Sequence, residues 1–153
     1  MLTISIPGQP PMTLRHLVLD VNGTLSARGE LIDGVEGRLA RIAHLLDLHV
    51  ASADTFGTAE ALATSVGASF ERVADGDEKG RLVLRLGADG VAAIGNGRND
   101  AAMFRAARLS IAVIGPEGAA GAALAAADVV CLDIRGALDL LLDDRVLLAT
   151  LRP

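Results

Sequence analysis

Aromatic residues are nearly absent from this sequence, which has no Trp, no Tyr and only three Phe. Proteins that bind single-stranded nucleic acid stack bases on aromatic side chains, and those that bind a duplex present a basic face to the phosphates. The formal net charge here is -5. Composition therefore argues against a nucleic-acid partner, and it predicts a core built from Leu, Val, Ile and Ala.

Long hydrophobic runs are also missing, although half of the residues are apolar. No run approaches the ~20 apolar residues that span a bilayer. The opening residues, MLTISIPGQPPM, lack the basic segment and the uninterrupted apolar stretch of a secretory signal. We therefore expect a cytoplasmic protein with no membrane partner.

Cysteine and histidine are scarce. The single cysteine, Cys131, lies in an apolar run and is expected to be a buried structural thiol. The histidines, His16, His44 and His49, do not show the spacing of metal ligands, and we expect them to be exposed or hydrogen-bonded.

Short apolar runs alternate with helical stretches along the chain, the pattern of a parallel sheet covered by helices on both faces. Strands are predicted at 15–20, 48–52, 70–74, 91–95, 110–114 and 129–132, and helices at 35–47, 58–66, 78–86, 100–107, 119–126 and 135–148. The prolines at positions 7, 10 and 11 predict a loose or edge-like segment before the first core strand. The length fits a single α/β domain over residues 1–153.

Polar residues follow three of the predicted strands. Asp20 ends the first, Ser52 and Asp54 end the second, and the segment 96–100 follows the fourth. Ligands of parallel sheets bind outside the carboxyl ends of the strands. These side chains are therefore expected to converge on one rim.

The first of these segments reads Asp-Val-Asn-Gly-Thr-Leu, residues 20–25. A carboxylate at a strand end can attack phosphorus and bind Mg²⁺, while the N–H groups of the turn point at the anion. An ordinary Asx-type turn that closes a strand would give the same letters. At the next strand end the Ser52 hydroxyl can donate to a phosphoryl oxygen, although residues 52–55 also suit the cap of the following helix.

The third segment reads Gly-Asn-Gly-Arg-Asn-Asp, residues 95–100. Its glycines allow close backbone approach to a ligand, and Asp100 offers the hard oxygen that Mg²⁺ prefers. A glycine turn with a capping Asn or Asp is the plain alternative. Lys79, near the start of a predicted helix, indicates little by itself.

Taken in order, these segments resemble the haloacid dehalogenase (HAD) superfamily and, more narrowly, the phosphorylation domain of P-type ATPases. The resemblance covers roughly residues 15–140. It implies a three-layer Rossmann-like domain and a Mg²⁺-dependent phosphatase. By this resemblance Asp20 is the nucleophile that forms an aspartyl-phosphate, and Lys79 neutralises charge and orients it. The implied substrate-binding residues are Gly23, Thr24, Ser52, Ala53 and Lys79, and the implied metal ligands are Asp20, Asn22 through its carbonyl, Asn96 and Asp100.

Two asparagines depart from the family pattern. Asn22 stands where HAD phosphatases carry the aspartate that serves as general acid and base, and Asn96 replaces the first aspartate of the metal loop. General acid–base help contributes typically ~10²–10⁴-fold, so slow turnover is expected. The loss of one carboxylate predicts weaker Mg²⁺ binding.

The intervals between Asp20, Ser52 and Lys79 are too short for a cap domain or an ATP-binding insertion, and residues 26–34 have room only for a flap. Such an open site suits a large substrate or closure by a second copy of the chain. The helix at 135–148 could form that contact, or it could cover the domain's own sheet.

The function predicted from the sequence is thus a slow Mg²⁺-dependent phosphatase acting on a phosphorylated small molecule or a phosphoprotein. The alternative is a regulatory module that keeps the phosphate and Mg²⁺ pocket without useful turnover. A generic α/β domain would require every motif to be coincidental.

Overall fold

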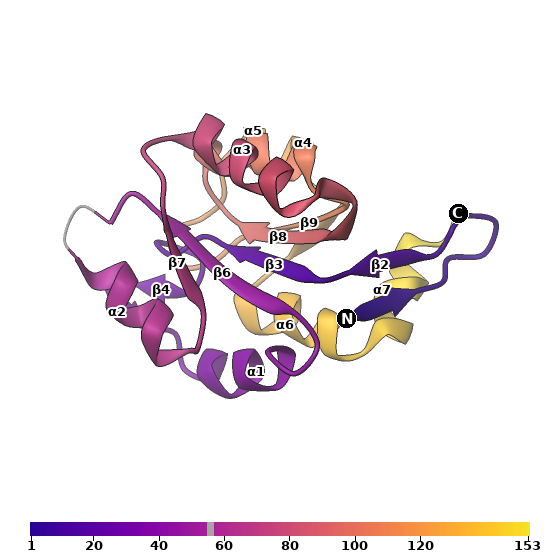
Figure 1. The fold of residues 1–153 in the computed structure, drawn as a ribbon, viewed down its shortest axis with the longest axis horizontal. Coiled ribbons are helices and arrows are strands. Elements are labelled where there is room, and N and C mark those ends of the chain that lie inside the picture. Colours follow the sequence, from indigo (N-terminus) through magenta and orange to yellow (C-terminus); the bar gives the residue numbers. More distant parts are fainter. Residues whose placement is uncertain (55–56) are drawn as a thin grey trace.

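A six-stranded parallel sheet forms the centre of the computed structural model, which describes residues 1–54 and 57–153 (Figure 1). Its strands are β3 (His16–Leu19), β6 (Asp47–Ser52), β7 (Ser69–Arg72), β8 (Val91–Gly95), β9 (Leu109–Val113) and β10 (Val129–Cys131). Their spatial order is β10-β9-β8-β3-β6-β7. The chain runs outward from β3 to β7 and then crosses to β8, so the order reverses between β3 and β8. Ligand sites of open α/β sheets lie at such a reversal.

Helices cover both faces of the sheet. On one face lie α1 (Val35–Ile42), α2 (Thr58–Ser65), α6 (Ile134–Leu142) and α7 (Asp144–Leu151), and on the other α3 (Gly76–Leu86), α4 (Ala101–Ala106) and α5 (Gly121–Ala126) (Figure 1). Strand side chains alternate between the two cores: Leu17 and Leu19 pack on the first face and Val18 on the second. This explains the uninterrupted apolar runs, because strands buried on both faces need them.

The predicted α/β class is confirmed, with each of the six predicted strands present at or within two residues of its expected position. The single-domain assignment stays a prediction. Two 3-10 turns, η1 (Ala88–Gly90) and η2 (Arg98–Asp100), precede β8 and α4. Phe56 and Thr55, the latter in the expected capping segment, lie outside the described residues. Among the described helices, none has the length and apolar character required to cross a membrane.

The predicted C-terminal helix at 135–148 is wrong in one respect, because it is two helices. Asp143 has an extended backbone (φ -131, ψ 90), and its carboxylate accepts a hydrogen bond from the Arg145 N–H. A side chain that bonds the backbone locally starts a new helix instead of continuing the old one. In α6 the apolar side chains, Leu138 and Leu141 among them, are buried in the core, so this helix covers the domain's own sheet.

The N-terminal segment is also better ordered than predicted. Strands β1 (Leu2–Ile4) and β2 (Met12–Leu14) pair as an antiparallel hairpin. Ile4 and Leu14 are buried, so alternate residues of the hairpin enter the core. The prolines lie in its turn, where missing N–H donors cost nothing. The flap expected at 26–34 is a small hairpin of β4 (Ser26–Ala27) and β5 (Glu30–Leu31).

Two histidines that are far apart in sequence meet on the neighbouring strands β3 and β6. His16 Nδ1 lies 3.2 Å from His49 Nε2, and the carboxylates of Asp47 and Glu71 lie 3.6 Å from His16 and His49, respectively. His49 is buried and hydrogen-bonded to His16 through Nε2, whereas its Nδ1 has no hydrogen-bond partner within the described chain, so the expectation of a satisfied residue is met at one ring nitrogen only. Burial, followed by the nearby His16, lowers the pKa of His49 even though Glu71 and Asp47 raise it. The folded protein therefore favours neutral His49.

Cys131 is half-buried, and burial raises its thiol pKa, as expected of an unreactive structural cysteine.

Candidate active site

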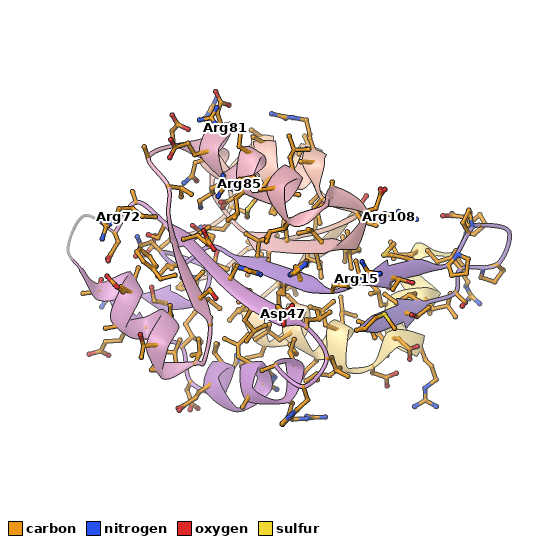
Figure 2. The ribbon with its side chains drawn as sticks, in the orientation of Figure 1. Arg15, Asp47, Arg72, Arg81, Arg85 and Arg108 are labelled. Carbon is orange, nitrogen blue, oxygen red and sulfur yellow. The ribbon has the colours of Figure 1, made fainter. Side chains whose placement is uncertain are left out.

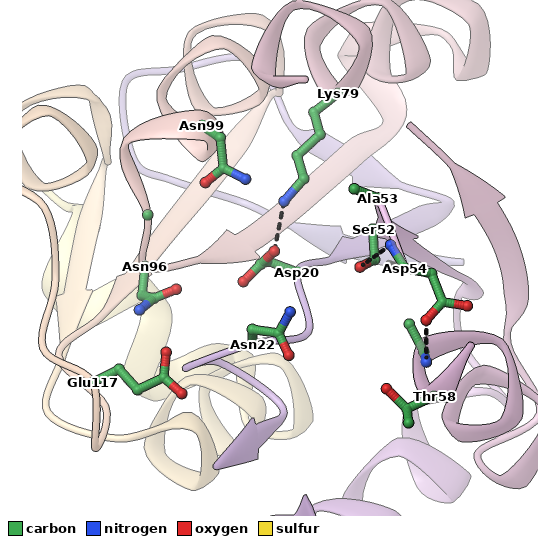
Figure 3. A pocket seen from close by; sticks show the side chains of 12 residues that line it. Asp20, Asn22, Ser52, Ala53, Asp54, Thr58, Lys79, Asn96, Asn99 and Glu117 are labelled. Atoms are coloured by element: carbon green, nitrogen blue, oxygen red, sulfur yellow. Dashed lines mark hydrogen bonds and ion pairs between the residues drawn. The ribbon is translucent and has the colours of Figure 1, made fainter. Parts of the chain in front are cut away.

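A cavity of about 330 Å³ opens at the carboxyl edge of the sheet, where the strand order reverses (Figure 3). Asp20 follows β3, Ser52 ends β6, Asn96 follows β8, and Lys79 enters from the first turns of α3. The convergence expected of strand-end polar residues is therefore present. The cavity is lined by Asp20, Asn22, Ser52, Ala53, Asp54, Thr58, Ala59, Lys79, Asn96, Gly97, Asn99 and Glu117.

Lys79 is the only lysine in the sequence, and its side chain is 2% exposed. Its Nζ lies 2.5 Å from Asp20 Oδ1 and 2.7 Å from Asp100 Oδ1. In contrast, Arg81, two residues further along α3, points out from the domain (Figure 2). A buried ammonium shared by two carboxylates is costly to assemble, and such groups concentrate at functional sites.

The start of α3 explains how Lys79 is positioned. The Asp75 carboxylate caps the helix by accepting the Glu78 N–H at 2.9 Å. Gly76 packs directly on the η2 turn, where an added Cβ would lie 2.6 Å from the Asn99 carbonyl oxygen. The cap and the close approach fix the first turn of α3 against the loop after β8, and Lys79 extends from that turn into the cavity.

Burial dominates the electrostatics of Asp20. Its pKa is raised to about 6, mainly by desolvation; the Asp100 charge also raises it, while the Lys79 charge and hydrogen bonds from Lys79 and Thr24 lower it. Burial by itself lowers the pKa of Lys79, but the charges of Asp20 and Asp100 outweigh it, and the pKa is raised. Near pH 7.5 the site thus holds a charged ammonium beside an ionised Asp20.

The turn after β3 orients the second oxygen of Asp20. Thr24 is fully buried, and its Oγ1 lies 3.1 Å from Asp20 Oδ2 and 3.2 Å from Asn96 Oδ1. Gly23 takes the left-handed conformation (φ 77). The N–H groups of Gly23 and Thr24 donate within the turn, to the carbonyls of Ser26 and Val21. The expectation that they point at an anion is therefore wrong, and neither residue lines the cavity.

Of the two interpretations of the segment after β6, the helix cap is confirmed, and the phosphoryl contact of Ser52 stays a prediction. The Asp54 carboxylate accepts the N–H of Ala59 at 2.8 Å, and so caps α2. Ser52 lines the cavity, where its Oγ accepts the Asp54 N–H at 3.1 Å. Among residues 1–54 and 57–153, the Ser52 hydroxyl donates no hydrogen bond. Ala53 lines the cavity beside it.

The predicted metal-loop residues divide into two groups. Asp100 is fully buried beneath the cavity. Its Oδ1 accepts from Lys79, and its Oδ2 accepts from the N–H groups of Asn96 (2.9 Å) and Gly97 (2.8 Å). It anchors Lys79 here, and its role as a metal ligand stays a prediction. Asn96 lines the cavity and donates through Nδ2 to the Gly118 carbonyl at 3.0 Å.

Sequence reasoning missed Glu117 at this site. It lies in the loop between β9 and α5, and its carboxylate enters the cavity (Figure 3). No motif contains it, but the loop follows the carboxyl end of a predicted strand, and that rule would have identified it. Asn99 and Thr58, which also line the cavity, belong to turns that start α4 and α2.

The donors around the cavity are hard oxygens, which suit a divalent cation such as Mg²⁺ or Mn²⁺. They are carboxylate oxygens of Asp20 and Glu117 and amide oxygens of Asn22 and Asn96. Within residues 1–54 and 57–153, no group of three or more His, Cys, Asp or Glu side chains is arranged to hold a metal ion. Mg²⁺ usually keeps several waters and binds one or two carboxylates together with a substrate phosphate.

Comparison with solved structures places this geometry in a known fold. A HAD family protein of Streptomyces avermitilis MA-4680 is 20% identical, with TM-score 0.67 over 88% of this chain and 86% of that one. The 3-deoxy-D-manno-octulosonate 8-phosphate phosphatase of Moraxella catarrhalis, solved with magnesium, phosphate and KDO, is 19% identical, with TM-score 0.66 over 91% and 94%. A zinc-transporting PIB-type ATPase in its E2.Pi state is 24% identical, with TM-score 0.67 over 78% of this chain and 20% of that one.

The chain has the HAD fold, as its motifs predicted. No protein-family model matches it. At the level of sequence it belongs to the same family as the uncharacterized protein MJ0073 of Methanocaldococcus jannaschii. The two are 48% identical over 62 residues, which make up 40% of this chain and 67% of that protein.

Proposed function

We propose that this protein is a slow Mg²⁺-dependent phosphatase whose nucleophile is Asp20. The observation that carries the proposal is the buried Lys79 ammonium, which joins Asp20 and Asp100 at the cavity where the strand order reverses. A structural ion pair would not need to open into a cavity lined by a serine hydroxyl and three asparagines. A phosphoryl-transfer site needs these groups, because its catalysis is mostly positioning and charge neutralisation.

Asp20 is held for attack by two hydrogen bonds. Lys79 donates to Oδ1 and Thr24 donates to Oδ2, so the carboxylate plane is fixed at the edge of the cavity. An oxygen of Asp20 forms a bond to phosphorus while the bond from phosphorus to the ester oxygen breaks, which leaves an aspartyl-phosphate. Lys79 and the Ser52 hydroxyl bind the phosphoryl oxygens. When bound, Mg²⁺ neutralises the remaining phosphoryl charge, and Asp20, Asn22 and Asn96 are the residues that would hold it.

Two proton transfers lack a helper at position 22. The leaving oxygen needs a proton, and the water that cleaves the aspartyl-phosphate must lose one. The Asn22 amide lines the cavity but exchanges no proton. Solvent therefore supplies and accepts these protons, and both steps lose the ~10²–10⁴-fold help of a positioned acid or base.

The cavity of about 330 Å³ is at the lower end of the range of small-molecule sites. The hairpin β4–β5 is the only element inserted between β3 and α1 in the described chain, so no cap encloses this side of the cavity. A phosphorylated small molecule or a phosphoprotein fits this arrangement. We also propose that a second copy of the chain closes the site. The protein is proposed to be cytoplasmic, without nucleic-acid or membrane partners.

Asn22 favours one alternative function, a regulatory module instead of an enzyme. A module that becomes phosphorylated on Asp20, or that binds phosphate and Mg²⁺ without turnover, would use the same groups for regulation. It differs from the phosphatase only in the fate of the phosphoryl group.

The test uses fresh protein with p-nitrophenyl phosphate and acetyl phosphate, with and without Mg²⁺, beside Asp20→Asn. The phosphatase predicts Mg²⁺-dependent phosphate release that is lost in the variant. Absence of release, together with beryllium fluoride bound at Asp20, would favour the regulatory module. Absence of both would contradict the proposed site.

A further inference from the structure

Glu117 occupies a defined position against the nucleophile's turn. Its Oε2 lies 3.0 Å from the point where a Cβ on Gly23 would stand, and the same point is 2.5 Å from Asn96 Nδ2. In Figure 3 the Glu117 carboxylate points into the cavity near Asn96, and Asn22 lines the same cavity. A carboxylate is therefore present in the cavity whose two asparagines stand at family aspartate positions.

The loop that carries Glu117 is held in place by Asn96. The Asn96 carbonyl accepts the Ala120 N–H at 2.8 Å, and its Nδ2 donates to the Gly118 carbonyl at 3.0 Å. On the other side of Glu117, Gly115 packs so closely that an added Cβ would lie 2.6 Å from the Gly23 carbonyl oxygen. Glu117 thus extends from a loop fixed at both ends.

An aspartate could not replace Asn96 without disturbing this loop. Its side chain has no N–H to donate, so a carboxylate oxygen would face the Gly118 carbonyl, and two acceptors would meet. The asparagine at position 96 therefore has two effects. It removes a negative charge from the loop after β8, and it fixes the neighbouring loop that carries the Glu117 carboxylate.

The charges lead to the same conclusion. Asp20 and Asp100 share the single ammonium of Lys79, which leaves one net negative charge beside it. Asp54, which caps α2, and Glu117 each add one more to the lining of the cavity. Within the described chain Glu117 forms no ion pair, so no described cation neutralises its carboxylate. A divalent cation is attracted in proportion to that charge.

We propose that Glu117 supplies the carboxylate that positions 22 and 96 lack and is part of the Mg²⁺ site, with Asn96 as the residue that positions it. The inference rests on the proposed function, because it assigns a further residue to the same site. Glu117 acts on the cation directly or through one of the waters that Mg²⁺ retains.

The test is the Mg²⁺ affinity of the intact chain, measured by isothermal titration calorimetry and checked with Mn²⁺ by electron paramagnetic resonance. The variants are Glu117→Gln and Glu36→Gln, a matched change on the exposed first turn of α1. A carboxylate about 6 Å from a divalent cation in water changes its affinity roughly tenfold. We expect about that loss for Glu117→Gln and none for Glu36→Gln. A companion variant, Asn96→Ser, removes the Nδ2 bond to Gly118 and is expected to weaken binding less when Glu117 is already Gln.

The outcomes separate the two proposals. Equal Mg²⁺ affinity in wild type and Glu117→Gln, with binding lost in Asp20→Asn, would overturn the role of Glu117 and leave the proposed function standing. Absence of Mg²⁺ and Mn²⁺ binding in the wild type would overturn both. A loss of affinity for both Mg²⁺ and Mn²⁺ in Glu117→Gln, with unchanged affinity in Glu36→Gln, would support the inference.

Discussion

Replacement of Lys79 by Met is expected to lower the free energy of unfolding, because Lys79 is the counter-ion of two buried carboxylates. The change removes the one buried ammonium and leaves the carboxylates of Asp20 and Asp100 without a counter-ion. Removal of one partner of a buried ion pair costs about 3–5 kcal/mol. Because one ammonium serves two carboxylates, we expect about 4 kcal/mol, a large part of the ~5–15 kcal/mol that stabilises a typical domain.

The expected loss is measured by urea unfolding and by Tm, without metal, at pH 8. In a domain of this size each kcal/mol shifts Tm by about 2–4 °C, so the drop is roughly 8–16 °C. The matched control is Arg81→Met, which removes the same charge from the same helix at a position outside the core. It should leave the stability nearly unchanged.

The pH dependence of Lys79→Met adds a second test. Lys79 lowers the pKa of Asp20, which burial otherwise raises, so in the variant that pKa rises above about 6. A carboxyl group with a raised folded-state pKa binds its proton more tightly in the folded chain, and stability then increases as the pH falls. The deficit of the variant should shrink between pH 8 and pH 5.5. Equal stability of Lys79→Met and Arg81→Met at pH 8 would refute the assignment of Lys79 as the shared counter-ion.

Three further predictions follow from single contacts. Asn22→Asp should speed hydrolysis of the phosphorylated protein by about 10²-fold or more, measured by single-turnover quench, whereas an unchanged rate would remove the explanation of slow turnover. The lowered pKa of His49 means that stability is present above the unfolded pKa near 6.5 and is lost as the pH falls, so His49→Gln should lose less free energy of unfolding than wild type between pH 7.5 and 5. Parallel pH profiles would contradict this. Gly76→Ala should cost about 1–3 kcal/mol in urea unfolding and weaken activity, because its Cβ would meet the Asn99 carbonyl, and a neutral effect would show that this approach is not tight.

Much of the fold could be predicted from the sequence because its core strands are buried on both faces. The run at 91–95, for example, is apolar throughout, as a central strand with helices on both sides must be. The N-terminal hairpin is not predicted because prolines in a segment argue against paired strands, whereas these prolines lie only in the turn. The break at Asp143 was hidden by the apolar pattern that runs through α6 and α7.

The site was predictable only in part, for a physical reason. Asp20, Ser52 and Asn96 end or follow strands, and a parallel sheet brings strand ends together whatever lies between them. The bonds that join them depend on tertiary contacts. The 2.5 Å contact with Asp20 places Lys79 in the site, and the bond from Asn96 to Gly118 places Glu117 there. No spacing in the sequence encodes either contact.

The central claim is that Asp20 takes the phosphoryl group. The measurement that tests it most directly is acid-quenched mass spectrometry of the intact chain after incubation with acetyl phosphate and Mg²⁺, followed by peptide mapping at low pH. The account predicts one phosphoryl group, on the peptide that contains Asp20, which disappears in Asp20→Asn and decays slowly because of Asn22. A phosphoryl group on another residue, or equal labelling of wild type and Asp20→Asn, would contradict it.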